Sequence, residues 1–158
     1  MVQDRRRNDR TGGEAGFSLA ELLAVLALVA IVLTIGIPIV NEQVRIAEAR
    51  EAADQMAVDL RAARMIAVSK HKSIVFSVNV DPTNSYSYEG TSGATRTRTM
   101  PGTVKIKSGS STSITFKQDG SVAAASTVTL ESVVSASTER WTIAVNTLGL
   151  ADLTHTRI

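Results

Sequence analysis

The chain has 158 residues, which is enough for about one domain. Hydrophobic residues make up 44% of it and charged residues 20%, so an apolar core is expected and intrinsic disorder is excluded. Because there is no cysteine, a disulfide framework, a thiolate nucleophile and a cysteine-based metal site are also excluded. The net charge of +2 is too small to indicate nucleic-acid binding by itself.

The first feature along the chain is an apolar segment behind a basic leader. Residues 22–40 carry no charge, and as a helix they are about 28 Å long, close to the hydrocarbon thickness of a bilayer. The leader, residues 1–16, contains four arginines, at positions 5, 6, 7 and 10. Basic residues beside an apolar span predict a cytoplasmic N-terminus and an exported C-terminal part.

Three interpretations compete for this N-terminal segment. An ordinary cleaved secretory signal has an apolar region of about 7–15 residues and a small-residue cleavage site, and neither is present here. A plain membrane anchor explains the length and the orientation but not Glu21, a carboxylate at the start of the apolar stretch. A carboxylate in hydrocarbon is costly, so Glu21 indicates a function and needs a partner.

The third interpretation supplies that partner. The segment Gly16-Phe17-Ser18-Leu19-Ala20-Glu21-Leu22-Leu23 resembles the cleavage and methylation signal of type IV prepilins and type II secretion pseudopilins. The resemblance implies that a membrane peptidase cuts after Gly16 and methylates the new N-terminal Phe17. Glu21 then falls fifth in the mature chain, where that family has a glutamate, and Pro38 falls where the family often has a kink.

Physical arguments give Glu21 and Pro38 their expected roles. Cleavage creates an α-ammonium on Phe17, and Glu21 can meet the ammonium of the next subunit when apolar helices stack with an axial stagger. In a low-dielectric bundle such a pair fixes the register between subunits. Pro38 removes a backbone donor and Gly36 adds softness, so a helix kink is expected near residues 34–36.

The pattern after Pro38 predicts an amphipathic helix over residues 41–70. Its apolar stripe is spaced 3, 4, 3, 4, 3 and 4, and consists of Ile46, Ala49, Ala53, Met56, Leu60, Ala63 and Ala67. Charged residues off the stripe are interpreted as a solvated face: Glu48, Glu51, Asp54, Asp59, Arg61 and Arg64. The aspartates among them suggest ion pairs with arginine and not acid–base catalysis.

Serine, threonine and turn sequences dominate the remainder of the chain and predict β-structure. Strands are expected at residues 73–80, 86–89, 104–107, 114–117, 127–130, 140–146 and 148–154. Turns are expected at residues 81–84 and at 118–121, where Asp119-Gly120 is a hairpin signal. A small antiparallel sheet packed on the helix stripe, an α+β fold, is the expected architecture.

A second resemblance covers residues 17–158. The helix end at residues 59–64, the segment 114–121 and the strand 141–146 occur in an order similar to that of the GspH/FimT group of minor pseudopilins and minor pilins. The resemblance implies a pilin-like fold with four parts. These are a cleaved leader (1–16), a membrane-spanning and filament-core helix (17–40), its amphipathic continuation (41–70) and a periplasmic β-rich head (71–158).

No catalytic constellation is present in the sequence. There is no phosphate-binding glycine loop and no nucleophile elbow, and His71 and His155 are interpreted as solvated side chains. No metal site and no cofactor are therefore expected. The chain is expected to be a substrate of the prepilin peptidase and not an enzyme.

The function implied by the resemblance is that of a minor pseudopilin of a type II protein secretion system. Such a subunit is expected in the periplasmic pseudopilus near its tip, where it helps to initiate assembly and drive protein export. The implied partners are the prepilin peptidase, other major and minor pseudopilins and the inner-membrane secretion platform. The expected location is the bacterial inner membrane, with one span, a cytoplasmic N-terminus and a periplasmic head.

The alternative is a FimT-like minor type IV pilin that binds DNA for uptake. On a strand, Arg96 and Arg98 point the same way and could contact phosphates, joined by Lys105 and Lys107. The other interpretation of these arginines is a charged edge strand that resists aggregation. Residues 71–158 contain eight basic and six acidic residues, so their net charge of +2 weighs against nucleic acid as a partner.

Overall fold

The computed structural model describes residues 16–80, 82–134 and 137–158, without the side chains of residues 35, 36, 38, 133 and 134. The expected leader before Gly16 and the expected turn residue Asp81 lie outside the described residues. The chain forms two compact units, Met1–Pro38 and Ile39–Ile158, and each is described by itself.

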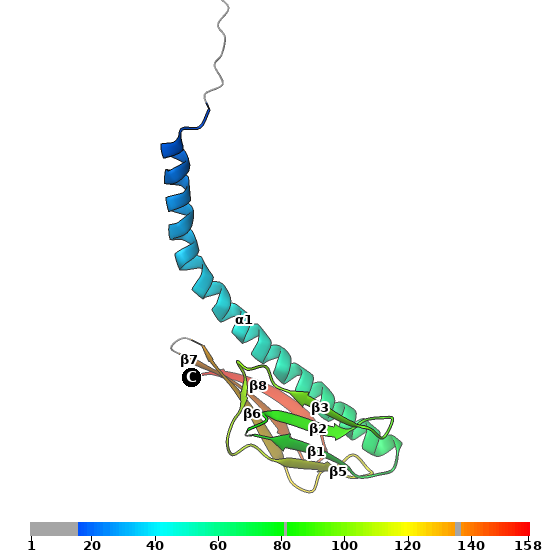
Figure 1. Ribbon diagram of the computed structural model, residues 1–158. Helices are drawn as coiled ribbons and strands as arrows, with labels where there is room; N and C mark the ends of the chain where they lie inside the picture. Colours follow the sequence, from blue (N-terminus) through cyan, green and yellow to red (C-terminus); the bar gives the residue numbers. More distant parts are fainter. Residues whose placement is uncertain (1–15, 81, 135–136) are drawn as a thin grey trace, which may run out of the picture. The chain divides into compact units, whose positions relative to one another are not determined.

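The single helix, α1, spans Leu19–Ser69 (Figure 1). Ser18 caps its start, because the Ser18 hydroxyl accepts a hydrogen bond of 3.2 Å from the Glu21 amide. At the other end His71 adopts a left-handed conformation, with φ of 47°, and the amides of His71 and Lys72 bond back to Val68 and Ala67. This pairing closes the helix as a Schellman motif.

The predicted apolar stripe is confirmed in the second unit. Ile46 is partly buried, and the other six stripe residues are 0% exposed: Ala49, Ala53, Met56, Leu60, Ala63 and Ala67. Alanines on this face let the strands approach the helix closely. The buried face therefore follows directly from the spacing of apolar residues in the sequence.

Eight strands follow the helix, and they form two sheets where one was expected. The strands are β1 (Ile74–Asn79), β2 (Ser85–Glu89), β3 (Thr95–Thr99), β4 (Lys105–Ile106), β5 (Ser113–Phe116), β6 (Ser126–Val134), β7 (Ser137–Val145) and β8 (Ala151–Arg157). One sheet has the order β3-β2-β1-β5 and the other β4-β6-β7-β8. All described pairings are antiparallel.

The expected hairpin around Asp119-Gly120 is wrong, although the turn itself is present. Asp119 accepts from the amide and hydroxyl of Ser121, and Gly120 has a φ of +79°. Only one bridge, between Phe116 and Val122, closes the turn. Because β5 pairs with β1 and β6 pairs with β4 and β7, the turn joins the two sheets instead of two partner strands.

The last strand begins later than expected, at Ala151 instead of residue 148. The amide of Gly149 bonds to the Asn146 carbonyl, and the amide of Leu150 bonds to the Asn146 side chain. These bonds hold residues 146–150 in a turn, so pairing with β7 starts only after it.

One hydrophobic core joins the helix stripe to the inner faces of both sheets. The largest fully buried side chains include Phe76, Tyr86 and Phe116, and the Phe76 and Tyr86 rings stack at 5.1 Å. Trp141 contributes from β7 with 3% of its surface exposed. The fold is therefore the predicted pilin-like α+β fold, with two antiparallel sheets against the second part of the helix.

Candidate functional site

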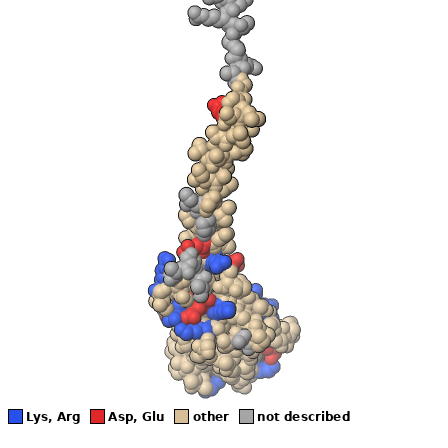
Figure 2. Space-filling model, turned by 60° about the vertical axis from the view of Figure 1, so that its left-hand side comes forward, with Lys and Arg blue, Asp and Glu red and all other residues tan. Residues whose placement is uncertain are grey.

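The first unit carries the segment that the sequence singled out. Gly16 and Phe17 precede the helix, the Phe17 side chain is 81% exposed, and Glu21 lies exposed in the first turn. On the face that Figure 2 shows, the described part of this unit is almost wholly free of charged side chains. Cleavage after Gly16, methylation of Phe17 and pairing of Glu21 stay predictions.

The described apolar side chains of this unit are largely exposed. From Leu22 to Ile37, the described large apolar side chains are between 47% and 68% exposed. The Thr34 hydroxyl is satisfied within the helix by the Ala30 carbonyl at 2.8 Å, as suits a residue in hydrocarbon. Among the described residues, α1 is the one helix long and apolar enough to cross a membrane. The helix kink expected from Gly36 and Pro38 stays a prediction, because the side chains of these two residues are not among those that the structure describes.

In the second unit, the expectation that Asp59 is solvated is wrong. Asp59 is 4% exposed and accepts hydrogen bonds from the hydroxyls of Tyr86, at 2.7 Å, and Tyr88, at 2.9 Å. The Arg98 Nε lies 3.0 Å from Asp59 Oδ2, the same oxygen that accepts from the Tyr86 hydroxyl. Asp59 does form the ion pair that was expected, but with strand β3 and not within its own helix. Asp54 pairs with Arg50 on the exposed face, at 3.8 Å.

The same cluster changes the chemistry of both tyrosines. Burial raises the pKa of Tyr86 far above its usual value, and the hydrogen bond to Asp59 and the charge of Asp59 raise it further. The pKa of Tyr88 is raised by burial and by Asp59 in the same way. Both hydroxyls therefore stay protonated at neutral pH and donate to Asp59, so the cluster is a structural contact between α1 and β2.

The structure separates the four basic residues that the DNA-binding interpretation grouped. Arg96 and Arg98 lie on β3, the edge of its sheet, and face the side of Tyr88 and Tyr86. Lys105 and Lys107 belong to the other sheet, where Lys107 pairs with Glu131 at 3.1 Å. Arg98 is already paired with Asp59.

The interpretation of His155 as a solvated side chain is incomplete. Its ring stacks on Trp141 at 4.8 Å, and its Nε2 lies 2.6 Å from the Glu139 carboxylate. Glu139 is 2% exposed and also pairs with Arg157 at 3.1 Å. This group ties β8 to β7. Within the described parts of the chain, no three metal-ligating side chains come together.

Sequence reasoning missed these two buried carboxylates, Asp59 and Glu139. A signal for the first was present, because Tyr86 and Tyr88 are two residues apart and so share one face of a strand, and a buried tyrosine hydroxyl requires a partner. For Glu139, the signal was its alternation with Trp141, Ile143 and Val145 on one strand.

Comparisons with solved structures show the same fold at low identity. Two crystal forms of the type IV minor pilin FimU of Pseudomonas aeruginosa match with TM-scores of 0.54 and 0.52 and 20% and 19% identity. They cover 68% and 66% of this chain and 89% and 91% of FimU. EpsH, the minor pseudopilin of the Type 2 Secretion System of Vibrio cholerae, matches with a TM-score of 0.50 and 13% identity, over 68% of this chain and 96% of EpsH.

A family model gives the family of the chain. No curated protein sequence matches the chain significantly. The model described as Type II transport protein GspH matches residues 52–149, which include the stripe from Ala53 to Ala67, Asp59 and strands β1 to β7. Because this match covers more than half of the chain, the chain belongs to the GspH family of type II secretion minor pseudopilins, which are structural proteins and not enzymes.

Proposed function

We propose that this protein is a subunit of the periplasmic pseudopilus of a type II secretion system, where it joins near the tip and helps to start assembly. The observation that carries the proposal is the GspH match over residues 52–149 on a chain whose N-terminal helix is apolar and exposed. A helix of this kind needs hydrocarbon or other apolar helices around it. The inner membrane before assembly and the filament core afterwards supply both environments.

Maturation is the first step of the proposal. The peptidase cuts after Gly16 and methylates Phe17 while the N-terminus is cytoplasmic and the head is periplasmic. Gly16 has no heavy atom within 4 Å of where a side chain would begin, and Phe17 is exposed, so the junction is accessible. The apolar helix starts two residues later, at Leu19, and the cut therefore leaves the membrane-spanning part intact.

Intact mass and N-terminal sequencing of the membrane-extracted protein test this step. Cells with the prepilin peptidase should yield a chain that begins at N-methyl-Phe17, and cells without it should yield the uncut chain. A chain that begins at Met1 in both kinds of cell would contradict the processing and leave Glu21 without its proposed partner.

Register setting by Glu21 is the second step. In this step the Glu21 carboxylate pairs with the new α-ammonium of a neighbouring subunit. The charge reversal Glu21→Lys tests this pairing. The variant should be cut and methylated normally but should fail to enter the filament and to support export. Thr34→Val is the matched control, since the Thr34 hydroxyl bonds only within its own helix. Normal filament entry of Glu21→Lys would refute the role.

The choice between secretion and a pilus is tested in cells that lack this chain. Loss of exported proteins from the medium, with twitching and DNA uptake unchanged, is the expected result. The reverse result would indicate a minor pilin. DNA binding is not part of the proposal, because Arg98 is paired with Asp59 and both Lys105 and Lys107 are bonded to the other sheet.

A further inference from the structure

We propose that the free edge of β3 and the facing side of α1 form a groove that binds an extended, basic peptide segment of a partner protein, which adds to the sheet as a fifth strand. The groove lies wholly within the unit Ile39–Ile158. The proposal therefore does not depend on maturation of the N-terminus or on the position of the subunit in a filament.

The edge of β3 presents unpaired backbone groups. β3 is the last strand of its sheet and pairs with β2 along its whole length. The Met100 amide bonds to the Asn84 carbonyl, and the Ala94 carbonyl accepts from the Gly90 amide, so the even-numbered residues point their backbone toward β2. Because these directions alternate along a strand, the groups of Thr95, Thr97 and Thr99 point outward. Within residues 16–80, 82–134 and 137–158, no backbone hydrogen bond is made on that side.

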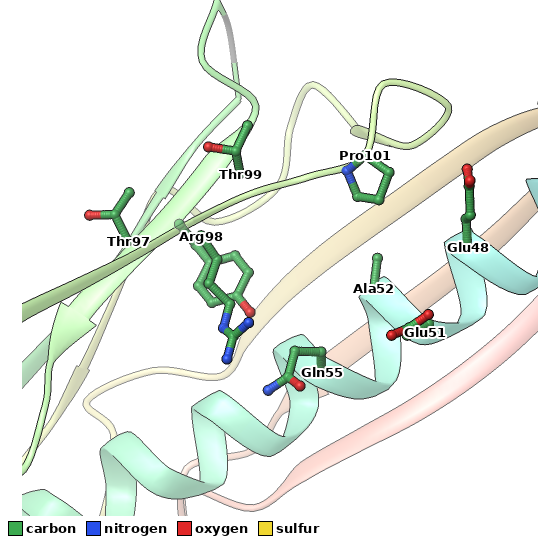
Figure 3. Close-up of a pocket in the computed structure, with 9 residues that line it drawn as sticks. Glu48, Glu51, Ala52, Gln55, Thr97, Arg98, Thr99 and Pro101 are labelled. Atoms are coloured by element: carbon green, nitrogen blue, oxygen red, sulfur yellow. The ribbon is translucent and has the colours of Figure 1, made fainter.

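Thr97 and Thr99, two of the residues whose backbone points outward, line a groove. It has a volume of about 470 Å³ and runs between β3 and helix α1. In Figure 3 the Thr97 and Thr99 side chains are directed away from the helix, and the backbone of β3 forms the wall on that side together with the Arg98 side chain. Gln55 and Glu51 form the opposite wall. An extended peptide in this position could use its amides and carbonyls against β3, as in other cases of strand addition.

The charges around the groove select a basic occupant. Glu48 and Glu51 line it from the helix, and Glu51 is exposed. The one basic side chain among the lining residues, Arg98, is neutralised by Asp59 at 3.0 Å. The groove therefore has an excess of negative charge, and lysine or arginine side chains directed at the helix would complement it.

A pair of synthetic peptides tests the charge preference on the full chain in detergent micelles. The probe is a capped heptapeptide of alternating threonine and lysine, and the comparison peptide has glutamate in place of lysine. The lysine peptide should bind at least tenfold more tightly in fluorescence anisotropy. Equal affinity, tighter binding of the glutamate peptide, or no binding of either would overturn the proposal, as would a single-stranded oligonucleotide that binds more tightly than the lysine peptide.

Backbone pairing is tested separately from charge. Two further lysine peptides carry N-methyl groups on alternate residues, in opposite phases, and only the phase that blocks the amides facing β3 should lose binding. Hydrogen exchange at the amides of Thr95, Thr97 and Thr99 should slow when the unmodified peptide binds. Retention of binding by both methylated peptides would show that no strand is added.

Variants of the groove complete the test. Thr97→Pro removes one outward amide, while proline is tolerated on an edge strand, and Thr97→Val keeps the amide. Loss of one hydrogen bond should weaken binding by about fivefold in the proline variant and leave the valine variant unchanged. Glu51→Lys should weaken binding of the lysine peptide, whereas Asp54→Lys, outside the groove, should not. If both lysine variants bind equally, the assigned groove is wrong.

Discussion

Arg98 on the edge strand β3 and Asp59 in the C-terminal part of α1 are joined by a contact of 3.0 Å, although they are 39 positions apart in the sequence. The Asp59 side chain is 6% exposed and that of Arg98 is 52% exposed. The pair therefore adds little as an ion pair in water, and the arginine acts mainly by covering a carboxylate whose other contacts are the two tyrosine hydroxyls. The head depends on Asp59 more than on Arg98.

Replacement of Asp59 by alanine should destabilise the head strongly. Two buried tyrosine hydroxyls would lose their acceptor, at about 1–3 kcal/mol each, so a loss of about 2–6 kcal/mol is expected. Urea unfolding followed by fluorescence of Trp141, the one tryptophan, measures this loss. Asp54→Ala is the control, because its exposed pair with Arg50 is worth no more than about 0.5 kcal/mol. Equal effects of the two variants would contradict the buried cluster.

Alkaline titration should find both tyrosines protonated well above their usual pKa. Tyr86 and Tyr88 are the only tyrosines, and burial and Asp59 raise the pKa of both. A raised folded pKa stabilises the fold below the unfolded pKa, near 10, and this stability is lost as the pH rises toward the folded pKa. Tyrosinate absorbance should therefore appear together with unfolding. A separate ionisation near pH 10 in folded protein would refute the assignment.

The residues of the helix stripe could be predicted because their signal is local. A helix brings residues three and four positions apart onto one face whatever follows, so the period of Ala49 to Ala67 was enough. The pairing of strands was not predictable in this way. β5 does not pair with β6 because β5 pairs with β1 instead. That long-range pairing cannot be inferred from the residues of the Asp119-Gly120 turn.

Asp59 shows the same limit at the level of one side chain. Its helical position lies beside the stripe residue Leu60, and its burial is decided by β2 and β3, which are 26 or more residues away in sequence. A charged residue at the border of a buried face is solvated unless another element covers it. Tyr86 and Tyr88, which lie on the same face of one strand, are the feature that could have indicated that Asp59 is buried and not solvated.

Acid should weaken the head partly through Glu131. Burial acts to raise the pKa of Glu131, but hydrogen bonds from Arg140 and Lys107 outweigh it and hold the pKa below its usual value of 4.5. A lowered folded pKa stabilises the fold above the unfolded pKa, and this stability is lost as the pH falls below about 4.5 toward the folded pKa. Glu131→Gln should flatten the loss of unfolding free energy in this range. Thr129→Val, two residues away and not titratable, should retain the slope of the wild type, and an unchanged slope in Glu131→Gln would count against the pairing.

Gly149 should tolerate no side chain, because two turns meet back to back at this position. Its φ is +74°, and an added Cβ would lie 2.0 Å from the Gly120 carbonyl oxygen and 3.1 Å from the Arg64 side chain. Gly109 has a φ of +89° with open space around it, so Gly109→Ala isolates the cost of the left-handed backbone, about 1–2 kcal/mol. Gly149→Ala carries that cost and must also separate the two turns. In urea unfolding it should lose at least about 2 kcal/mol more than Gly109→Ala. Similar losses for the two variants would mean that the turns at Gly120 and Gly149 are not in contact, and that the joint between the two sheets is looser than the structure has it.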